Sequence, residues 1–120
     1  MKLAELILED KSSPYADWFV ELPVDVAVKA TTATLRMQPG YLLSTEWFGG
    51  ISKFKLNIGA GWRIYFAKNG LEIVMLLGGG SKRSQQKDID RAVSFWNDYK
   101  QRKQSLAKAA KLAEKVEQKG

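Results

Sequence analysis

The segment from residue 51 to residue 80 constrains the fold most, because it has the pattern of successive strands joined by tight turns. Polar and apolar residues alternate from Ile51 to Ile58 and again from Trp62 to Lys68, which is typical of strands with one buried face. Gly59-Ala60-Gly61 separates the two runs, and a glycine-rich loop of this length is typical of a hairpin. We therefore expect an antiparallel pair of strands in the middle of the chain.

A second hairpin signal follows directly. Asn69-Gly70 is favoured in two-residue turns, because both central residues of such a turn need positive φ. The next run, Leu71 to Leu77, is apolar at nearly every position, which predicts a central strand covered on both faces. The segment GGGSKRS, residues 78–84, is expected to form a flexible, cationic link to the last part of the chain.

One face of the first hairpin is expected to gather polar and cationic side chains. If the glycine loop closes symmetrically, Asn57 lies opposite Arg63 and Lys55 lies opposite Tyr65. Because side chains alternate along a strand, the shared face then holds Lys53, Lys55, Asn57, Arg63 and Tyr65. Crowding of like charges on this face is expected to lower the pKa of at least one of the two lysines.

The residues before this hairpin predict two strands and two helices. Strands are expected over Leu3 to Leu8 and, briefly, over Thr45 to Phe48. Ser13 as N-cap and Pro14 at the first helical position predict a helix, and a second helix is expected from Val24 to about Met37. The expected inner positions are Tyr15, Trp18, Phe19 and Leu22 in the first helix and Val24, Val28, Thr31 and Leu35 in the second.

A C-terminal helix is expected after the glycine segment, with Ser84 as its cap. Its expected inner face consists of Ile89, Ala92, Val93, Phe95, Trp96 and Tyr99. Residues 101–120 are rich in Ala, Lys, Glu and Leu and are expected to be helical or partly frayed. We expect a domain over residues 1–103 and a charged helical extension over 104–120, either solvated or a surface for a partner helix.

The length and the hydrophobic content of the chain are typical of one domain with a single core, since the chain has 120 residues of which 45% are hydrophobic. The pattern of runs predicts an α+β fold with a small antiparallel or mixed sheet of about four to five strands, two N-terminal helices and a C-terminal helix. The sequence contains no Cys, which excludes disulfides and thiol chemistry, and no His. Acid–base chemistry would therefore depend on carboxylates, Lys, Tyr or Arg.

Positive charge is concentrated in the second half of the chain. Residues 1–50 carry 4 basic and 7 acidic groups, whereas residues 51–100 carry 9 and 4, and the net charge is +6. A basic half built around a sheet face favours a polyanion as partner, with nucleic acid ahead of a membrane surface. We expect no signal peptide, because charges occur within the first ten residues, and no membrane span, so a cytoplasmic location is expected.

Two stretches are similar to the motifs of a known family. Residues 59–66, GAGWRIYF, match the pattern G-x-G-[YW]-R-[VI]-Y-[FY], and residues 76–89, LLGGGSKRSQQKDI, match L-L-x-G-G-x-K-x-x-Q-x-x-D-I. In these motifs the chain resembles the RelE/HigB-like toxins of bacterial type II toxin–antitoxin modules, in particular the addiction-module killer proteins of the RelE/ParE superfamily. The resemblance covers roughly residues 5 to 100. Lys53-Phe54-Lys55, where many killer proteins have Glu and Arg, is similar to the Lys-x-Lys pair of RelE.

This resemblance implies a RelE-like fold and a metal-independent endoribonuclease, an mRNA interferase that cuts mRNA on the ribosome and blocks translation. The 2′-hydroxyl of the RNA would attack the adjacent phosphate, and no metal ion or cofactor is expected. The candidate catalytic residues are Lys53, Lys55, Arg63 and Lys82. Arg63 would grip the phosphate, Lys55 is slightly preferred over Lys53 as general base, and Lys82 would donate a proton or bind a phosphate. The candidate substrate-binding residues are Asn57, Tyr65, Arg83, Gln85 and Lys87, with Tyr65 stacking on a base.

The resemblance also implies partners. A helix-turn-helix, DNA-binding antitoxin would neutralise the toxin, with contacts that extend to the acidic N-terminal half and oligomers formed through the antitoxin, and the ribosome and mRNA would be the targets. No membrane partner is expected. Two alternatives stay open: a ParE-like inhibitor of DNA gyrase, which shares the fold, and a non-toxic RNA-binding member of the family.

Overall fold

The computed structural model describes residues 2–37, 47–70 and 73–119. In chain order the elements are β1 (Lys2–Glu5), α1 (Pro14–Val20), α2 (Val24–Met37), β2 (Trp47–Phe48), β3 (Ile51–Lys55), β4 (Arg63–Asn69), β5 (Ile73–Gly80), the 3₁₀ turn η1 (Lys82–Ser84) and α3 (Gln85–Lys119). The strands form one sheet in the order β1-β5-β4-β3-β2, in which only the β1–β5 pair is parallel. The expected α+β class, with a mixed sheet between N-terminal and C-terminal helices, is confirmed.

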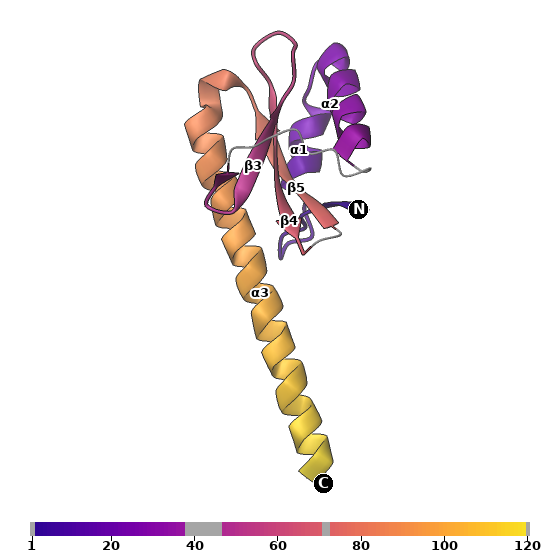
Figure 1. Ribbon diagram of the computed structural model, residues 1–120, viewed down its shortest axis with the longest axis vertical. Helices are drawn as coiled ribbons and strands as arrows, with labels where there is room; N and C mark the ends of the chain where they lie inside the picture. Colours follow the sequence, from indigo (N-terminus) through magenta and orange to yellow (C-terminus); the bar gives the residue numbers. More distant parts are fainter. Residues whose placement is uncertain (1, 38–46, 71–72, 120) are drawn as a thin grey trace.

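The sheet lies between two helical layers, with α1 and α2 on one face and α3 on the other (Figure 1). Alternate residues of β4 supply the two cores. Ile64 and Phe66 pack with the side chains of α1 and α2, whereas Tyr65 and Ala67 pack with those of α3. The cationic face predicted for the first hairpin is therefore the face along which α3 lies.

The predicted start of α1 is confirmed. Ser13 has extended backbone angles and its Oγ accepts a hydrogen bond from the Ala16 backbone N–H at 3.1 Å, while Pro14 is the first helical residue. The same hydroxyl donates to Glu5 Oε1 at 2.6 Å. This cap therefore ties α1 to the end of β1.

Several strand ends differ from the predicted ones. β1 ends at Glu5 rather than Leu8, although the Leu6 backbone N–H still donates to the Leu76 carbonyl at 2.9 Å. β3 ends at Lys55 rather than Ile58, because the chain then turns into the glycine loop. The predicted short strand is present as β2 over Trp47–Phe48, whereas residues 45 and 46 lie outside the described part of the chain, as do residues 71 and 72 of the predicted third strand.

The second helix has the predicted bounds but the opposite inner face. Its buried side chains are Val26, Ala30, Ala33 and Met37, whereas the predicted stripe of Val24, Val28, Thr31 and Leu35 is exposed. The two stripes have the same spacing and start two residues apart, which places them about 200° apart around the helix. The buried stripe, which includes two alanines, packs into the core shared with α1 and the sheet, so the size of the apolar side chains does not identify the inner face of α2.

The glycine run is the end of β5, so the prediction of a flexible link over residues 78–84 is wrong. Gly78, Gly79 and Gly80 pair with Tyr65, Ile64 and Arg63 of β4. A methyl group on Gly79 would collide with the Trp18 indole of α1, and one on Gly80 would collide with the Asp88 carboxylate of α3. These glycines are needed for the close approach of both helices to the strand, rather than for flexibility.

The predicted inner face of α3 is confirmed, because Ile89, Ala92 and Trp96 are buried and Val93, Phe95 and Tyr99 pack against the same core. The helix begins at Gln85, directly after Ser84, as predicted. The Ser84 hydroxyl does not cap it but donates to Asp88 Oδ2 at 2.5 Å, at the end of η1.

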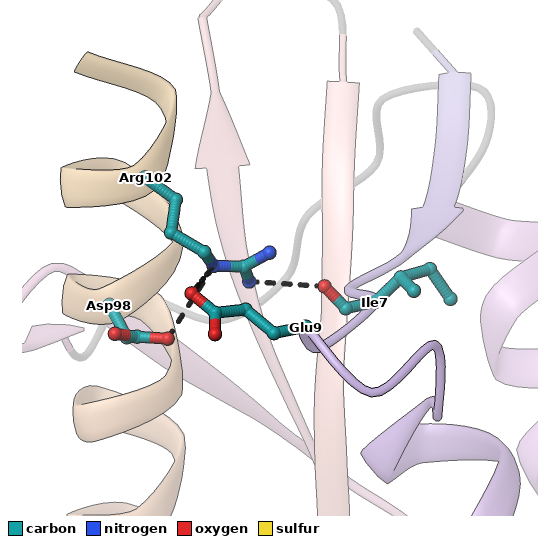
Figure 2. A network of polar contacts seen from close by, with 4 residues as sticks. All are labelled: Ile7, Glu9, Asp98 and Arg102. Atoms are coloured by element: carbon teal, nitrogen blue, oxygen red, sulfur yellow. Dashed lines mark hydrogen bonds and ion pairs between the residues drawn. The ribbon is translucent and has the colours of Figure 1, made fainter. Parts of the chain in front are cut away.

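Arg102 forms the last major anchor of α3 on the body of the protein (Figure 2). Its Nη2 donates to the Ile7 carbonyl at 3.1 Å, and its Nε lies 3.5 Å from Asp98 Oδ2 and 4.0 Å from Glu9 Oε1. Its guanidinium also lies 5.7 Å from the centre of the Tyr99 ring. The segment after β1 is thereby held against the middle of α3.

Beyond Lys103, whose Nζ donates to Asn69 Oδ1 at 3.3 Å, α3 leaves the body. The helix continues to Lys119, and every side chain from residue 104 to residue 117 is exposed (Figure 1). The helical character predicted for residues 101–119 is therefore confirmed. Within the described ranges, no helix combines the length and the apolar character that crossing a membrane requires.

Candidate functional site

The candidate site is built on the β3–β4 ladder, where Lys55 pairs with Arg63 and Lys53 pairs with Tyr65. The predicted register is wrong by two residues, because the loop closes earlier than a symmetrical hairpin would: the Leu56 backbone N–H donates to the Trp62 carbonyl at 2.8 Å. A shift of two residues preserves the face to which each side chain points. Lys53, Lys55, Arg63 and Tyr65 therefore share one face as predicted.

Asn57 is not part of this ladder. It lies exposed in the loop after β3, where residues 56–62 connect the two strands, and it does not pair with Arg63. The prediction that places Asn57 opposite Arg63 is wrong for this reason. Only its position on the rim of the hairpin remains compatible with a contact to a substrate.

Arg63 is nearly covered, with 6% of its surface exposed. Its Nη1 donates to the Gly61 carbonyl at 2.5 Å, and its Nε is buried without a hydrogen-bond partner. Among the described residues no carboxylate forms an ion pair with it. A guanidinium with an unused donor and no neutralising carboxylate retains the capacity to bind an anion.

Lys82 lies beside Arg63, on the other side of the hairpin loop. Its backbone N–H donates to the Ala60 carbonyl at 3.3 Å, which fixes η1 against the hairpin loop. A methyl group on Gly61 would lie 3.2 Å from Lys82 Cβ and 3.5 Å from Arg63 Nη1, so these two side chains meet over Gly61. The structure therefore brings Lys82 to Arg63, although they are far apart in sequence.

Lys53 is held by the first residue of α3. Its Nζ donates to Gln85 Oε1 at 3.1 Å, and the lysine is half-buried. The sequence predicts a contact between Gln85 and the substrate, whereas in the structure the side-chain carbonyl oxygen of Gln85 accepts the hydrogen bond from Lys53. Lys55, in contrast, is exposed on the same strand.

The predicted stacking role of Tyr65 is wrong, because the tyrosine is 1% exposed and its ring is part of the core beneath α3. Burial raises the pKa of its hydroxyl to about 12; the nearby Asp88 carboxylate adds to this rise, and Arg63 opposes it. Tyr65 therefore remains a neutral donor at physiological pH.

Arg83 and Lys87, the other predicted substrate-binding residues, are exposed on η1 and the first turn of α3. In the part of the chain that the structure describes, no hydrogen bond or ion pair joins them to Lys53, Lys55 or Arg63. They extend the positive surface around the site rather than forming part of its centre.

Sequence reasoning missed a cavity beside this site. A space of about 460 Å³ lies between α1 and α3 over the last residues of β5, and its walls include Trp18, Trp62, Tyr65, Asp88 and Phe95. The run of three glycines could have indicated this cavity. Residues without side chains at the end of a strand leave a space that the neighbouring helices fill only partly.

Comparison with known proteins does not assign the chain to a family. A scan against models of protein families gives no match, and no curated protein matches the sequence. The resemblance to RelE/HigB-like toxins therefore rests on the two motifs and on the arrangement of the residues within them.

Proposed function

We propose that the protein is the toxin of a type II toxin–antitoxin module and acts as a ribosome-dependent mRNA endoribonuclease. The observation that carries this proposal is the pairing of Lys55 with Arg63 on one sheet face, where Arg63 has no described carboxylate partner. Lys53 and Lys82 flank the pair. Three lysines around one buried guanidinium suit the doubly charged phosphorane-like transition state of phosphodiester cleavage.

The proposed reaction needs only the RNA and these side chains. Lys55 takes the proton from the 2′-hydroxyl, and the resulting oxygen bonds to the adjacent phosphorus while the bond to the 5′ oxygen breaks. Arg63 binds the phosphate oxygens and Lys82 delivers a proton to the departing 5′ oxygen. The products are a 2′,3′-cyclic phosphate and a 5′-hydroxyl, so no redox change or co-reactant is required.

A DNA-binding antitoxin is the proposed protein partner, in the cytoplasm. The outer face of α2 supports a protein partner, because Val24, Val28 and Leu35 are 81%, 61% and 58% exposed. Apolar side chains exposed together at helical spacing commonly mark an interaction surface. This face belongs to the acidic N-terminal half, which suits a protein better than RNA.

A second candidate is a member of the family that binds RNA without cutting it. The bond between Arg63 Nη1 and the Gly61 carbonyl favours this alternative, because a guanidinium held by its own loop must reorient to grip a scissile phosphate.

Induction of the protein in bacteria, followed by mapping of mRNA 5′ ends, tests the proposal. Cuts repeated in register with codons support it, double-strand DNA breaks indicate a ParE-like inhibitor of gyrase, and normal growth indicates the inactive alternative. Arg63→Ala should abolish the cuts, whereas Lys108→Ala, which removes an exposed cation from the projecting end of α3, should not. Undiminished cutting by Arg63→Ala would show that the site is misplaced.

A further inference from the structure

The projecting end of α3 carries large apolar side chains that face water. Leu106 and Val116 are 73% and 72% exposed, and Leu112 is exposed as well. They lie where the helix has left the body, and every side chain from residue 104 to residue 117 is exposed there (Figure 1). A helix in water gains most of its stability from packing of one face rather than from the propensity of its residues. Exposed apolar side chains gathered on such a helix mark an interaction surface.

These side chains have the spacing of a coiled-coil seam. Four apolar residues form the seam, at the first and fourth positions of successive heptads: Leu106, Ala109, Ala113 and Val116. Because each residue turns the helix by about 100°, the lysines of the segment lie on the other side. These lysines are Lys108, Lys111 and Lys115. The segment therefore has one apolar side, suited to one other helix, and one solvated side.

The seam is complementary to itself when two copies run in opposite directions. With a two-fold axis at the level of residue 111, Leu106 faces the partner's Val116, and Ala109 faces the partner's Ala113. Each of these contacts occurs twice, as two-fold symmetry requires. Every residue of the seam thus meets an apolar residue of the second copy.

The positions beside the seam favour the same direction. In the antiparallel pair Lys103 lies beside the partner's Glu117, and Leu112 lies beside the partner's Leu112. A parallel pair would instead place Leu112 beside the carboxylate of Glu117 and both bodies at the same end. The macrodipoles of two antiparallel helices also attract each other, whereas those of parallel helices repel. Charge and apolar contacts therefore select the antiparallel arrangement.

We propose that two copies of the chain associate through antiparallel pairing of residues 103–119 of α3. Two heptads with alanines at the centre bury little apolar area, so the contact belongs to the small, transient class, with a dissociation constant of about 100 μM. This inference does not rest on the proposed nuclease. Gln85, which contacts Lys53 in the candidate site, precedes residue 111 by about 40 Å along the helix. The sites of the two copies therefore stay open at opposite ends of the dimer.

Sedimentation equilibrium of the full chain measures the association. Between about 5 μM and about 1 mM the mean mass should rise from 13.5 kDa, the mass of the monomer, towards twice this value. Ala113→Glu places a carboxylate in the seam and should raise the dissociation constant at least about tenfold. Ala107→Glu is the matched control, since it makes the same change at an exposed alanine outside the seam, and it should leave the constant within about twofold. Circular dichroism at about 5 μM should show equal helical content in both variants.

A charge exchange tests the direction of the pairing. Lys103→Glu and Glu117→Lys each place like charges side by side and should raise the dissociation constant about three- to tenfold. The double variant restores opposite charges and should recover most of the affinity. In a parallel pair these two positions lie about 21 Å apart along the helices, so no recovery would follow. Lys103→Glu and the double variant both lose the hydrogen bond to Asn69, so their comparison isolates the exchange.

A chain that stays monomeric at about 1 mM overturns the proposal and leaves the seam to a helix of a different protein. Equal weakening by the two alanine variants also overturns it, because the seam would then not be the contact. Association that neither alanine variant weakens refutes it too and assigns the interface to another surface, such as the exposed face of α2. A double charge variant no tighter than Lys103→Glu excludes the antiparallel direction. Dimers of a protein that cuts no mRNA would refute the nuclease and leave the pairing standing.

Discussion

Lys55 and Arg63 lie directly opposite each other on antiparallel neighbouring strands. Opposed residues have their Cβ atoms roughly 4.5–5.5 Å apart, and like charges at this distance destabilise a sheet. The repulsion between Lys55 and Arg63 therefore lowers the stability of the folded protein by a small amount. The pair is therefore the first target for separating function from folding.

Lys55→Ala should reduce RNA cleavage at least about 100-fold, and the free energy of unfolding should stay equal or rise by a few tenths of a kcal/mol. Lys55→Arg distinguishes charge from proton transfer, since arginine keeps the charge but does not give up its proton. If Lys55 is the general base, the arginine variant is as inactive as the alanine variant in a single-turnover assay. Recovery of most of the activity with arginine would refute the role as base. Lys111→Ala, on the exposed end of α3, is the control.

Gly80→Ala should lower the free energy of unfolding by about 1–3 kcal/mol, because the new methyl group meets the Asp88 carboxylate. The double variant with Asp88→Ala removes the obstacle and should recover a large part of this loss. Urea denaturation of the two single variants and the double variant measures the coupling. Additive losses would show that the two residues do not touch.

Stability should fall in strong base, because the pKa of Tyr65 is raised to about 12 from its usual value of 10. Between these values the unfolded chain has lost a proton that the folded chain keeps, so the free energy of unfolding decreases with pH, by at most about 1.4 kcal/mol per pH unit. Below pH 10 the contribution is fully present. Tyr15, raised to about 12 mainly by burial, behaves in the same way.

Tyr65→Phe isolates one of these two contributions. The wild-type protein should lose stability relative to the variant as the pH rises from 10 to 12, and the difference should be constant below pH 9. Chemical denaturation at pH 9 and pH 11 suffices. A constant difference at both pH values would show that the hydroxyl is accessible to water.

Removal of residues 105–120 should change the free energy of unfolding by less than about 0.5 kcal/mol, because the side chains that follow Lys103 are exposed as far as residue 117. Arg102→Ala should cost more, about 1 kcal/mol, through loss of the hydrogen bond to the Ile7 carbonyl and of its contact with the Tyr99 ring. Thermal unfolding followed by circular dichroism compares the two. A larger effect from the truncation would mean that the extension packs on the body.

Most helices and strands, and the two faces of the hairpin, could be predicted from the sequence. The faces were predicted correctly although the register was not, because a shift of two residues leaves each side chain on the same face. Lys53, Lys55, Arg63 and Tyr65 share a face whether the strands pair as predicted or two residues further along. The alternation of polar and apolar residues does not reveal how deeply each side chain is buried. It does not distinguish exposed Lys55 from nearly covered Arg63, since coverage depends on η1 and α3, which come from a distant part of the chain.

The errors in α2 and in the glycine run have a common cause. Both predictions weighed each residue by its own properties, favouring large side chains as core and glycine as a link. In the structure, Ala30 and Ala33 are buried because their side of α2 packs into the core shared with α1 and the sheet, and Gly79 and Gly80 are required because Trp18 and Asp88 lie against them. Packing between elements is a property of pairs of elements, and a single run of residues does not reveal it.

The projecting end of α3 gives the molecule extents of 62 × 27 × 24 Å. Frictional drag on so elongated a particle exceeds that on a sphere of equal mass, so a monomer will elute early from a gel-filtration column and imitate a dimer. Light scattering, which reports mass independently of shape, is the measurement on which any statement about its stoichiometry should depend.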